Sequence, residues 1–209
     1  MKKPIILSIL MLSIGVGCFA QDDTETGKNE FTIWGGFSPD SSTMIKGTGR
    51  TPDARFGIAA LRYARRFNNS DKINLKYTAD FVPFAALNYP DFEIASTPPQ
   101  TILSVRPTRY GFGVAPLGLQ ANFRPRKKHQ PFIGGSGGIL YLNKRAPNVV
   151  GSRLAFTADI GAGVEIKLRE KRALTIGYKY YHISNGGRGI ANPGFDNHLF
   201  YLGYTFLSK

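Results

Sequence analysis

The chain has 209 residues, a formal net charge of +13 at pH 7, and a composition that is 42% hydrophobic and 20% charged. This length fits a single domain. The one cysteine, Cys18, excludes an internal disulfide and a metal site built from several thiolates. The excess of basic residues favours an anionic partner, and we expect acidic lipid headgroups rather than nucleic acid.

The first twenty residues have the features of a secretory signal peptide. Lys2 and Lys3 form a basic start, residues 5–16 form an apolar run, and small residues precede a predicted cleavage point after Ala20. The run is shorter than the ~20 residues that a transmembrane helix needs. A lipidated Cys18 is the alternative, but the large aliphatic residue expected three positions before it is missing. Removing 20 of 209 residues, two lysines among them, leaves 189 residues with a net charge near +11.

Beyond this signal segment, side chains alternate between apolar and polar with a period of two. Residues 153–167 are the clearest example, with an apolar side chain at every even position from Leu154 to Ile166. Residues 72–81 follow the same pattern. Such a period predicts strands with one apolar and one polar face. We expect eight strands, near residues 30–38, 55–66, 71–82, 109–123, 131–142, 153–167, 172–184 and 197–207.

The lengths of these strands and loops predict an all-β fold, an eight-stranded antiparallel up-and-down β-barrel that crosses the bacterial outer membrane and spans residues 21–209. Most of the strands reach the ~9–11 residues that a tilted strand needs to cross a bilayer. Long connections alternate with short turns, so both termini are expected on the short-turn, periplasmic side. The long connections are residues 39–54, 83–108, 143–152 and 185–196.

A soluble barrel of the lipocalin type is the alternative, because alternation alone does not say which face points inward. Strand length, loop asymmetry and the export signal favour the membrane barrel. Its inward faces would be rich in small residues, as a narrow eight-stranded interior requires. Its outward faces would carry the large apolar residues, Trp34 among them, and an aromatic girdle that includes Tyr178, Tyr180, Tyr201 and Tyr204.

His182 and Ser184 form the first candidate site. Side chains two positions apart on a strand share one face. These two continue the apolar parity of strand 172–184, so we expect them to point outward near the outer leaflet. A serine hydroxyl becomes an effective nucleophile when a base takes its proton. The alternative is that both side chains bind water in the headgroup zone. Asp196 supplies a carboxylate twelve residues after Ser184, although turns also favour Asp.

The segment Tyr181–Gly187, followed by Asn-Pro-Gly at residues 192–194, resembles the C-terminal signature of the outer-membrane lipid A 3-O-deacylases, the PagL-type family often labelled acyloxyacyl hydrolases. Upstream of this signature only the barrel pattern is shared. The resemblance implies an eight-stranded barrel with a Ser-His-Glu triad on the outer surface of its wall. It also implies a hydrolase that removes the acyl chain ester-linked at position 3 of lipid A.

By this resemblance, Ser184 matches the nucleophile, His182 the base and Asp196 the acid. The family has Glu where this chain has Asp196, and Asp is one methylene shorter. Asn197 or a water molecule is therefore an alternative partner for the His182 ring. A non-catalytic barrel, structural or for interaction, remains the rival function because of this difference, and a soluble lipid binder is the third.

The resemblance also implies an oxyanion hole. Asn192 matches the family residue assigned to it, and backbone N–H groups near Asn185 and Gly187 would be further donors. Arg188 is either a partner for a lipid A phosphate or a solvated loop residue. The implied partners are lipopolysaccharide and outer-membrane lipid, with a homo-oligomer left open and nucleic acid not expected.

Two other motifs have plainer interpretations. The run Gly134–Gly138 lacks the Lys-Ser/Thr ending of a phosphate loop, so we expect it to be part of a strand that a neighbouring segment approaches closely. The basic segment Arg124–His129 is expected to be a solvated periplasmic turn. Neither His129 nor His198 has Cys or carboxylate partners at metal-ligand spacing, so we expect no metal and no cofactor.

Overall fold

A computed structural model of the chain describes residues 29–41, 51, 53–68, 70–94, 102–147, 151–169, 171–188 and 194–207. The predicted signal segment lies outside these residues. Within them, no helix is long and apolar enough to cross a membrane. The strands in the described ranges are β1 Asn29–Ser38, β2 Arg55–Arg66, β3 Ile73–Asn88, β4 Asp91–Ile94, β5 Ile102–Val105, β6 Thr108–Phe123, β7 His129–Ala146, β8 Ser152–Arg169, β9 Arg172–Ser184 and β10 Phe195–Leu207.

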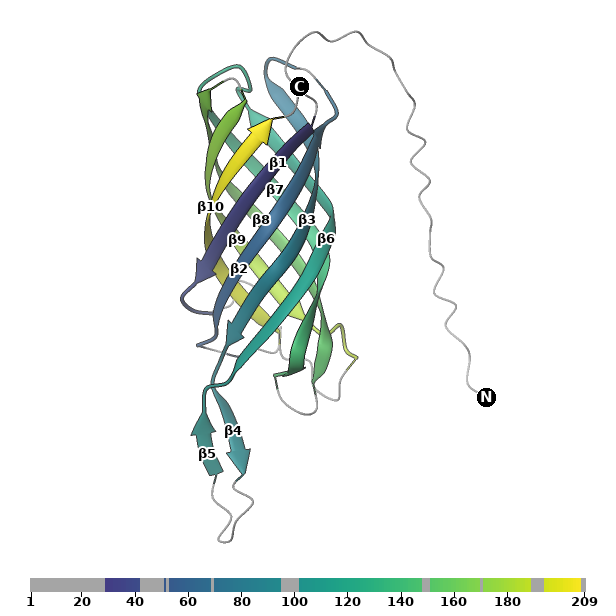
Figure 1. The fold of residues 1–209 in the computed structure, drawn as a ribbon, viewed down its shortest axis with the longest axis vertical. Coiled ribbons are helices and arrows are strands. Elements are labelled where there is room, and N and C mark those ends of the chain that lie inside the picture. Colours follow the sequence, from purple (N-terminus) through teal and green to yellow (C-terminus); the bar gives the residue numbers. More distant parts are fainter. Residues whose placement is uncertain are drawn as a thin grey trace, which may run out of the picture.

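Eight of the strands in the described residues form one closed antiparallel barrel, and β4 and β5 pair with each other in a separate hairpin (Figure 1). The barrel closes where β1 pairs with β10, from Glu30 opposite Leu207 to Phe37 opposite Phe200. The start of β1 and the end of β10 therefore lie at one end, together with the tight turns β2–β3, β6–β7 and β8–β9. Closure pairs both edges of every barrel strand, as a hydrocarbon environment requires.

The long connections lie at the other end of the barrel, where the β4–β5 hairpin projects (Figure 1). The eight-stranded barrel is confirmed, but residues 83–108, predicted as a loop, contain the last part of β3 and this hairpin. The last part of β3 was missed because of Pro83, which cannot donate a ladder hydrogen bond. The β3–β6 register shifts between Val82 and Ala85, and both of these side chains are buried. The shift interrupts the period of two from which the strand was predicted.

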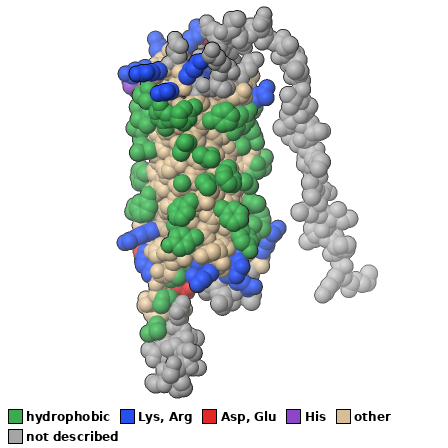
Figure 2. Space-filling model, in the orientation of Figure 1, with side chains coloured by type: hydrophobic (Ala, Val, Ile, Leu, Met, Phe, Trp, Pro, Cys, Tyr) green, Lys and Arg blue, Asp and Glu red, His purple; other side chains and the backbone are tan. Residues whose placement is uncertain are grey.

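Large apolar side chains cover the outside of the barrel. On the face shown in Figure 2 they lie over the middle of the barrel, and Lys and Arg side chains gather at both ends. Phe31, Ile33 and Phe37 on β1 are about half exposed, and Ile160 on β8 is 68% exposed. The apolar parity therefore points outward, which is the arrangement of a barrel in lipid and the reverse of a lipocalin.

Trp34 and Tyr201, predicted to face outward, lie inside the barrel. They are 4% and 5% exposed, and their rings meet edge to face with centroids 5.5 Å apart. Trp34 Nε1 donates to Asp80 Oδ1 at 3.1 Å. The prediction was wrong because it was based on residue type. The position in the strand decides which face a side chain occupies: outward side chains have odd numbers on β1 and even numbers on β10, so Trp34 and Tyr201 point inward. The remaining girdle candidates keep the outward parity: Tyr178, Tyr180 and Tyr204.

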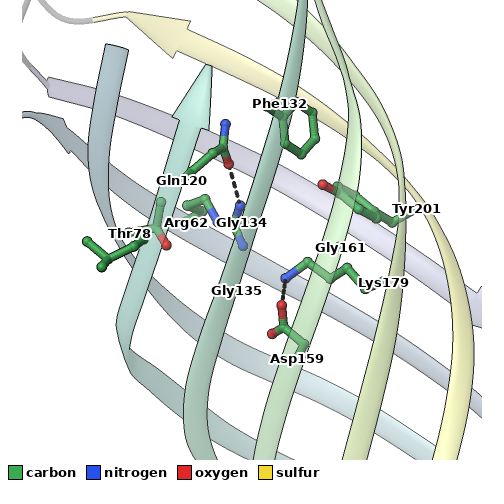
Figure 3. A pocket seen from close by; sticks show the side chains of 11 residues that line it. Arg62, Thr78, Gln120, Phe132, Gly134, Gly135, Asp159, Gly161, Lys179 and Tyr201 are labelled. Atoms are coloured by element: carbon green, nitrogen blue, oxygen red, sulfur yellow. Dashed lines mark hydrogen bonds and ion pairs between the residues drawn. The ribbon is translucent and has the colours of Figure 1, made fainter. Parts of the chain in front are cut away.

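Ion pairs fill much of the interior. Lys76 Nζ lies 2.7 Å from Glu30 Oε2 and 3.1 Å from Glu165 Oε2. Lys179 Nζ lies 2.9 Å from Asp159 Oδ1, beside a small interior hollow (Figure 3). All five side chains are nearly inaccessible to solvent. Buried charges persist when they are paired, so each of these residues requires its partner on another strand. The pair of Lys76 on β3 with Glu165 on β8 connects distant parts of the wall, whereas Lys179 and Asp159 lie on the neighbouring strands β9 and β8.

The glycine run Gly134–Gly138 lies within β7, as predicted. A Cβ atom at Gly134 would lie 2.8 Å from the backbone oxygen of Leu119, and one at Gly138 would lie 2.3 Å from that of Val114. These distances are too short for any side chain, so β6 approaches β7 where glycine permits it. The basic segment 124–128 forms the β6–β7 turn at the short-turn end.

We predict that Lys76→Met lowers the free energy of unfolding by about 3 kcal/mol, because Glu165 loses its cation inside the barrel. Urea unfolding in detergent micelles measures this change. Adding Glu165→Gln to the same protein should recover part of the loss. Lys72→Met, at an exposed position in the turn just before β3, is the control and should change the value by less than about 0.5 kcal/mol. Equal stabilities for Lys76→Met and the control would contradict the role of the pair.

Candidate active site

The register of β9 against β10 places His182 directly opposite Asp196. Both belong to the outward rows of their strands, which continue Leu174, Ile176 and Tyr178 on β9. His182 Nδ1 lies 2.5 Å from Asp196 Oδ1. The imidazole is 29% exposed, whereas the carboxylate is 3% exposed. The pair therefore lies on the outer wall at the long-loop end. The Asp196 carboxylate is buried, whereas the His182 ring is partly accessible from outside the barrel.

This contact fixes how the His182 ring can act. An ionised carboxylate only accepts hydrogen bonds, so the proton at the contact belongs to Nδ1. In the neutral ring, Nε2 is then the acceptor and points away from Asp196. Charge-assisted bonds to a carboxylate are shorter and stronger than neutral ones. Asp196 thus holds the tautomer and the orientation in which Nε2 is available as a base.

Ser184 follows His182 on the same face of β9. Two residues of a strand span about 6.8 Å, so the two side chains can turn toward each other over one strand repeat. Ser184 is half-buried and pairs with Phe156 of β8. A small hollow beside it is lined by Leu142, Ala155 and Phe195, among others. The structure therefore brings the three predicted residues, His182, Ser184 and Asp196, to one place on the wall.

The turn that follows Ser184 is held by Asn185. Its Oδ1 accepts a hydrogen bond from Gly187 N at 2.9 Å, and its backbone oxygen accepts one from Arg188 N at 3.3 Å. Gly186 and Gly187 have φ values of +62° and +75°, a region that favours glycine. The Gly187 N–H, predicted as an oxyanion donor, is thus bonded to Asn185 in this structure. Asn192, the other predicted donor, lies outside the described residues.

Asn197 does not orient the His182 ring, contrary to the alternative considered from the sequence. Its side chain is fully buried on the inward row, and its Nδ2 donates to the backbone oxygens of Tyr181 at 3.2 Å and Phe195 at 3.3 Å. Those carbonyls belong to the residues just before His182 and Asp196. Asn197 therefore ties together the backbones that carry the base and the acid.

Sequence reasoning placed Tyr178 and Tyr180 on the outer wall but missed their contacts with His198, on the short-turn side of the pair. The Tyr178 hydroxyl lies 2.6 Å from His198 Nδ1, and the rings of Tyr180 and Phe200 pack against His198 and Tyr178 respectively. The sequence could have indicated this contact, because His198 shares the outward parity of Asp196 and therefore lies on the same face of β10. In the described part of the chain, no group of three or more His, Cys, Asp or Glu residues could hold a metal ion.

The fold and this outward-facing surface define an outer-membrane β-barrel protein whose wall carries a histidine, a serine and a carboxylate. The sequence profile of the family described as "Lipid A 3-O-deacylase (PagL)" matches residues 71–205, well over half of the chain. The chain belongs to this lipid A 3-O-deacylase family. At the level of the family it is a lipid A deacylase, a hydrolase of the bacterial outer membrane that acts on lipopolysaccharide.

The solved structure of PagL supports the fold. The outer-membrane enzyme PagL is 16% identical, with a TM-score of 0.53, and the match covers 85% of this chain and 98% of that one. Neisserial surface protein A is 10% identical over 85% and 96% of the two chains, with a TM-score of 0.46. Outer membrane protein W of E. coli is 13% identical over 89% and 100%, with a TM-score of 0.45. No protein with a curated description matches the sequence significantly.

The turn after Ser184 offers a matched pair of substitutions. We predict that Gly187→Ala costs about 1–2 kcal/mol, because alanine is strained at positive φ, while its Cβ would enter open space. Gly186→Ala should cost more, because its Cβ would also lie 2.9 Å from the Phe156 ring and displace it. Thermal unfolding in detergent, followed by circular dichroism, measures both. Equal losses for the two variants would contradict the close packing of Gly186 on Phe156.

Proposed function

We propose that the chain is a serine esterase that removes the acyl chain ester-linked at position 3 of lipid A, at the outer leaflet. The observation that carries this proposal is the 2.5 Å contact between His182 Nδ1 and Asp196 Oδ1, with Ser184 next on the same outward face. Membership of the lipid A 3-O-deacylase family supports the choice of substrate.

In the proposed first step, His182 Nε2 takes the proton from Ser184 Oγ as the oxygen attacks the ester carbonyl carbon. The carbonyl π electrons move onto oxygen and form a tetrahedral intermediate. When the intermediate collapses, the bond to the sugar oxygen breaks, and the protonated His182 gives its proton to that oxygen. The acyl chain is then bonded to Ser184, and Asp196 has stabilised the imidazolium throughout.

In the second step, water replaces the sugar hydroxyl. His182 Nε2 takes a proton from the water as it attacks the acyl-enzyme carbonyl, and the Ser184 oxygen leaves with the proton returned. The products are a fatty acid and the deacylated lipid. The partly exposed imidazole at the long-loop end of the barrel supports access of water from the headgroup side.

The oxyanion needs donors placed where its charge develops. We propose Asn192 together with backbone N–H groups at Asn185 and Gly187, by analogy with the family. The present hydrogen bond from Gly187 N to Asn185 Oδ1 then has to be shared or released when the oxyanion forms. Ordering this turn around a bound ester would place the donor only when the substrate is present.

The rival proposal, a barrel of this family without activity, depended on the Asp in place of Glu. The cross-strand position of Asp196 argues against that rival, because a residue directly opposite His182 needs only the shorter side chain to reach Nδ1. The rule that directly opposite side chains lie ~4.5–5.5 Å apart at Cβ supports this geometry. The outward apolar band argues against a soluble lipid binder.

We predict that Ser184→Ala lowers kcat by at least about 10³-fold, because the nucleophile is removed. Purified protein is incubated in detergent with lipopolysaccharide, and lipid A is followed by mass spectrometry for the loss of one acyl chain. Ser104→Ala, at an exposed serine on the hairpin of the long-loop end, is the control and should retain wild-type activity. Identical spectra for wild type and Ser184→Ala would contradict a serine esterase.

Two substitutions test the acid. Asp196→Asn should lower kcat by about 10³–10⁴-fold, because a neutral amide stabilises neither the required tautomer nor the imidazolium. Asp196→Glu should also lose activity, by about 10²-fold, since the added methylene displaces the ring from a contact that is already 2.5 Å long. The same lipid A assay measures both. Full activity in Asp196→Asn would remove Asp196 from the mechanism, and full activity in Asp196→Glu would show that its exact length is unimportant.

A further inference from the structure

Arg188 occupies a defined position beside the candidate site. Its guanidinium carbon lies 5.0 Å from the centre of the Phe156 ring, and its backbone N–H donates to Asn185. An arginine over an aromatic face is held there by electrostatic attraction to the ring. The side chain is nevertheless exposed, so its hydrogen-bond donors remain accessible while its orientation is restricted.

The place of Phe156 fixes where this charge lies. Phe156 belongs to the outward row of β8 and pairs directly with Ser184 of β9. The Arg188 guanidinium is therefore on the outer side of the wall, one strand away from the proposed nucleophile and at the long-loop end. A lipid whose ester reaches Ser184 would have its headgroup at this level.

No ion pair among the described residues neutralises Arg188. The arginines that pair with carboxylates in that part of the chain are Arg62, Arg66, Arg109 and Arg126. An exposed guanidinium presents several N–H donors in a planar fork that matches a phosphate group in two-point contact. Its position and free donors thus suit an anionic group on the substrate.

We propose that Arg188 binds the phosphate carried by the same sugar whose acyl ester faces Ser184. This inference rests on the proposed function and adds a specificity determinant to it. The phosphate and the ester belong to one rigid ring, so a guanidinium held on Phe156 positions the ester relative to the nucleophile. Lysine would supply charge without the planar fork and without the same packing on the ring.

Measuring lipid binding to a variant that cannot hydrolyse the ester separates this role from catalysis. In the Ser184→Ala background, affinity is measured in mixed micelles for bisphosphorylated lipid A and for chemically dephosphorylated lipid A. The ratio of the two affinities should fall about tenfold when Arg188→Gln is added, because a charge-assisted bond is lost. Arg188→Lys should recover only part of the ratio. Arg55→Gln, at an exposed arginine of the same barrel end on β2, is the matched control and should leave the ratio unchanged.

An unchanged ratio in Arg188→Gln would overturn the proposal, and so would an equal fall in Arg55→Gln, which would indicate a diffuse charge effect. In active protein, kcat/KM for the two substrates should show the same tenfold change in ratio for Arg188→Gln. If wild type and Ser184→Ala have equal activity, the proposed function fails, whereas the binding ratio still decides the role of Arg188.

Discussion

The register between β9 and β10 is the constraint on which the outer-wall site depends. Side chains alternate along a strand, so a slip of one residue would turn the outward row of β9 into the lumen. It would also move His182 away from Asp196, which now stands directly opposite. The fully buried Asn197 amide holds this register at the site, since it binds the backbone carbonyls just before both residues. A short carboxylate can serve here because the strands, and not a flexible loop, set the distance.

The barrel separates its polar chemistry into two surfaces. Inside, paired charges such as Lys76 with Glu30 and Glu165 are excluded from solvent and stabilise the wall. Outside, the polar group of His182, Ser184 and Asp196 lies at the long-loop end, next to an apolar surface that includes Ile160. Polar groups facing lipid are costly when they lack partners. Asp196 has His182 as its partner, and Tyr178 has His198 as its partner, closer to the short-turn end of the wall.

Much of this arrangement could be predicted from the sequence, because the period of two is a property of the chain alone. That period placed His182 and Ser184 on an outward face, where they are found. It failed at Pro83, where a bulge resets the alternation, and the last part of β3 was missed for that reason. The hairpin β4–β5 has strands of only four residues, too short to show a clear period. Trp34 and Tyr201 were assigned by residue type and lie inside. The contact between His182 and Asp196 required the cross-strand register, which spacing along the chain does not determine. The family signature pointed to Asp196 but left its reach to the ring open.

In the proposed mechanism, Ser184 is a nucleophile activated by His182 and Asp196. The most direct test is the reaction of the folded barrel in detergent with a fluorophosphonate, followed by peptide mass spectrometry. We expect a phosphonate adduct on Ser184 alone, absent in Ser184→Ala and formed far more slowly in Asp196→Asn. Failure of the wild-type protein to form the adduct, or formation at the same rate in Asp196→Asn, would contradict this mechanism.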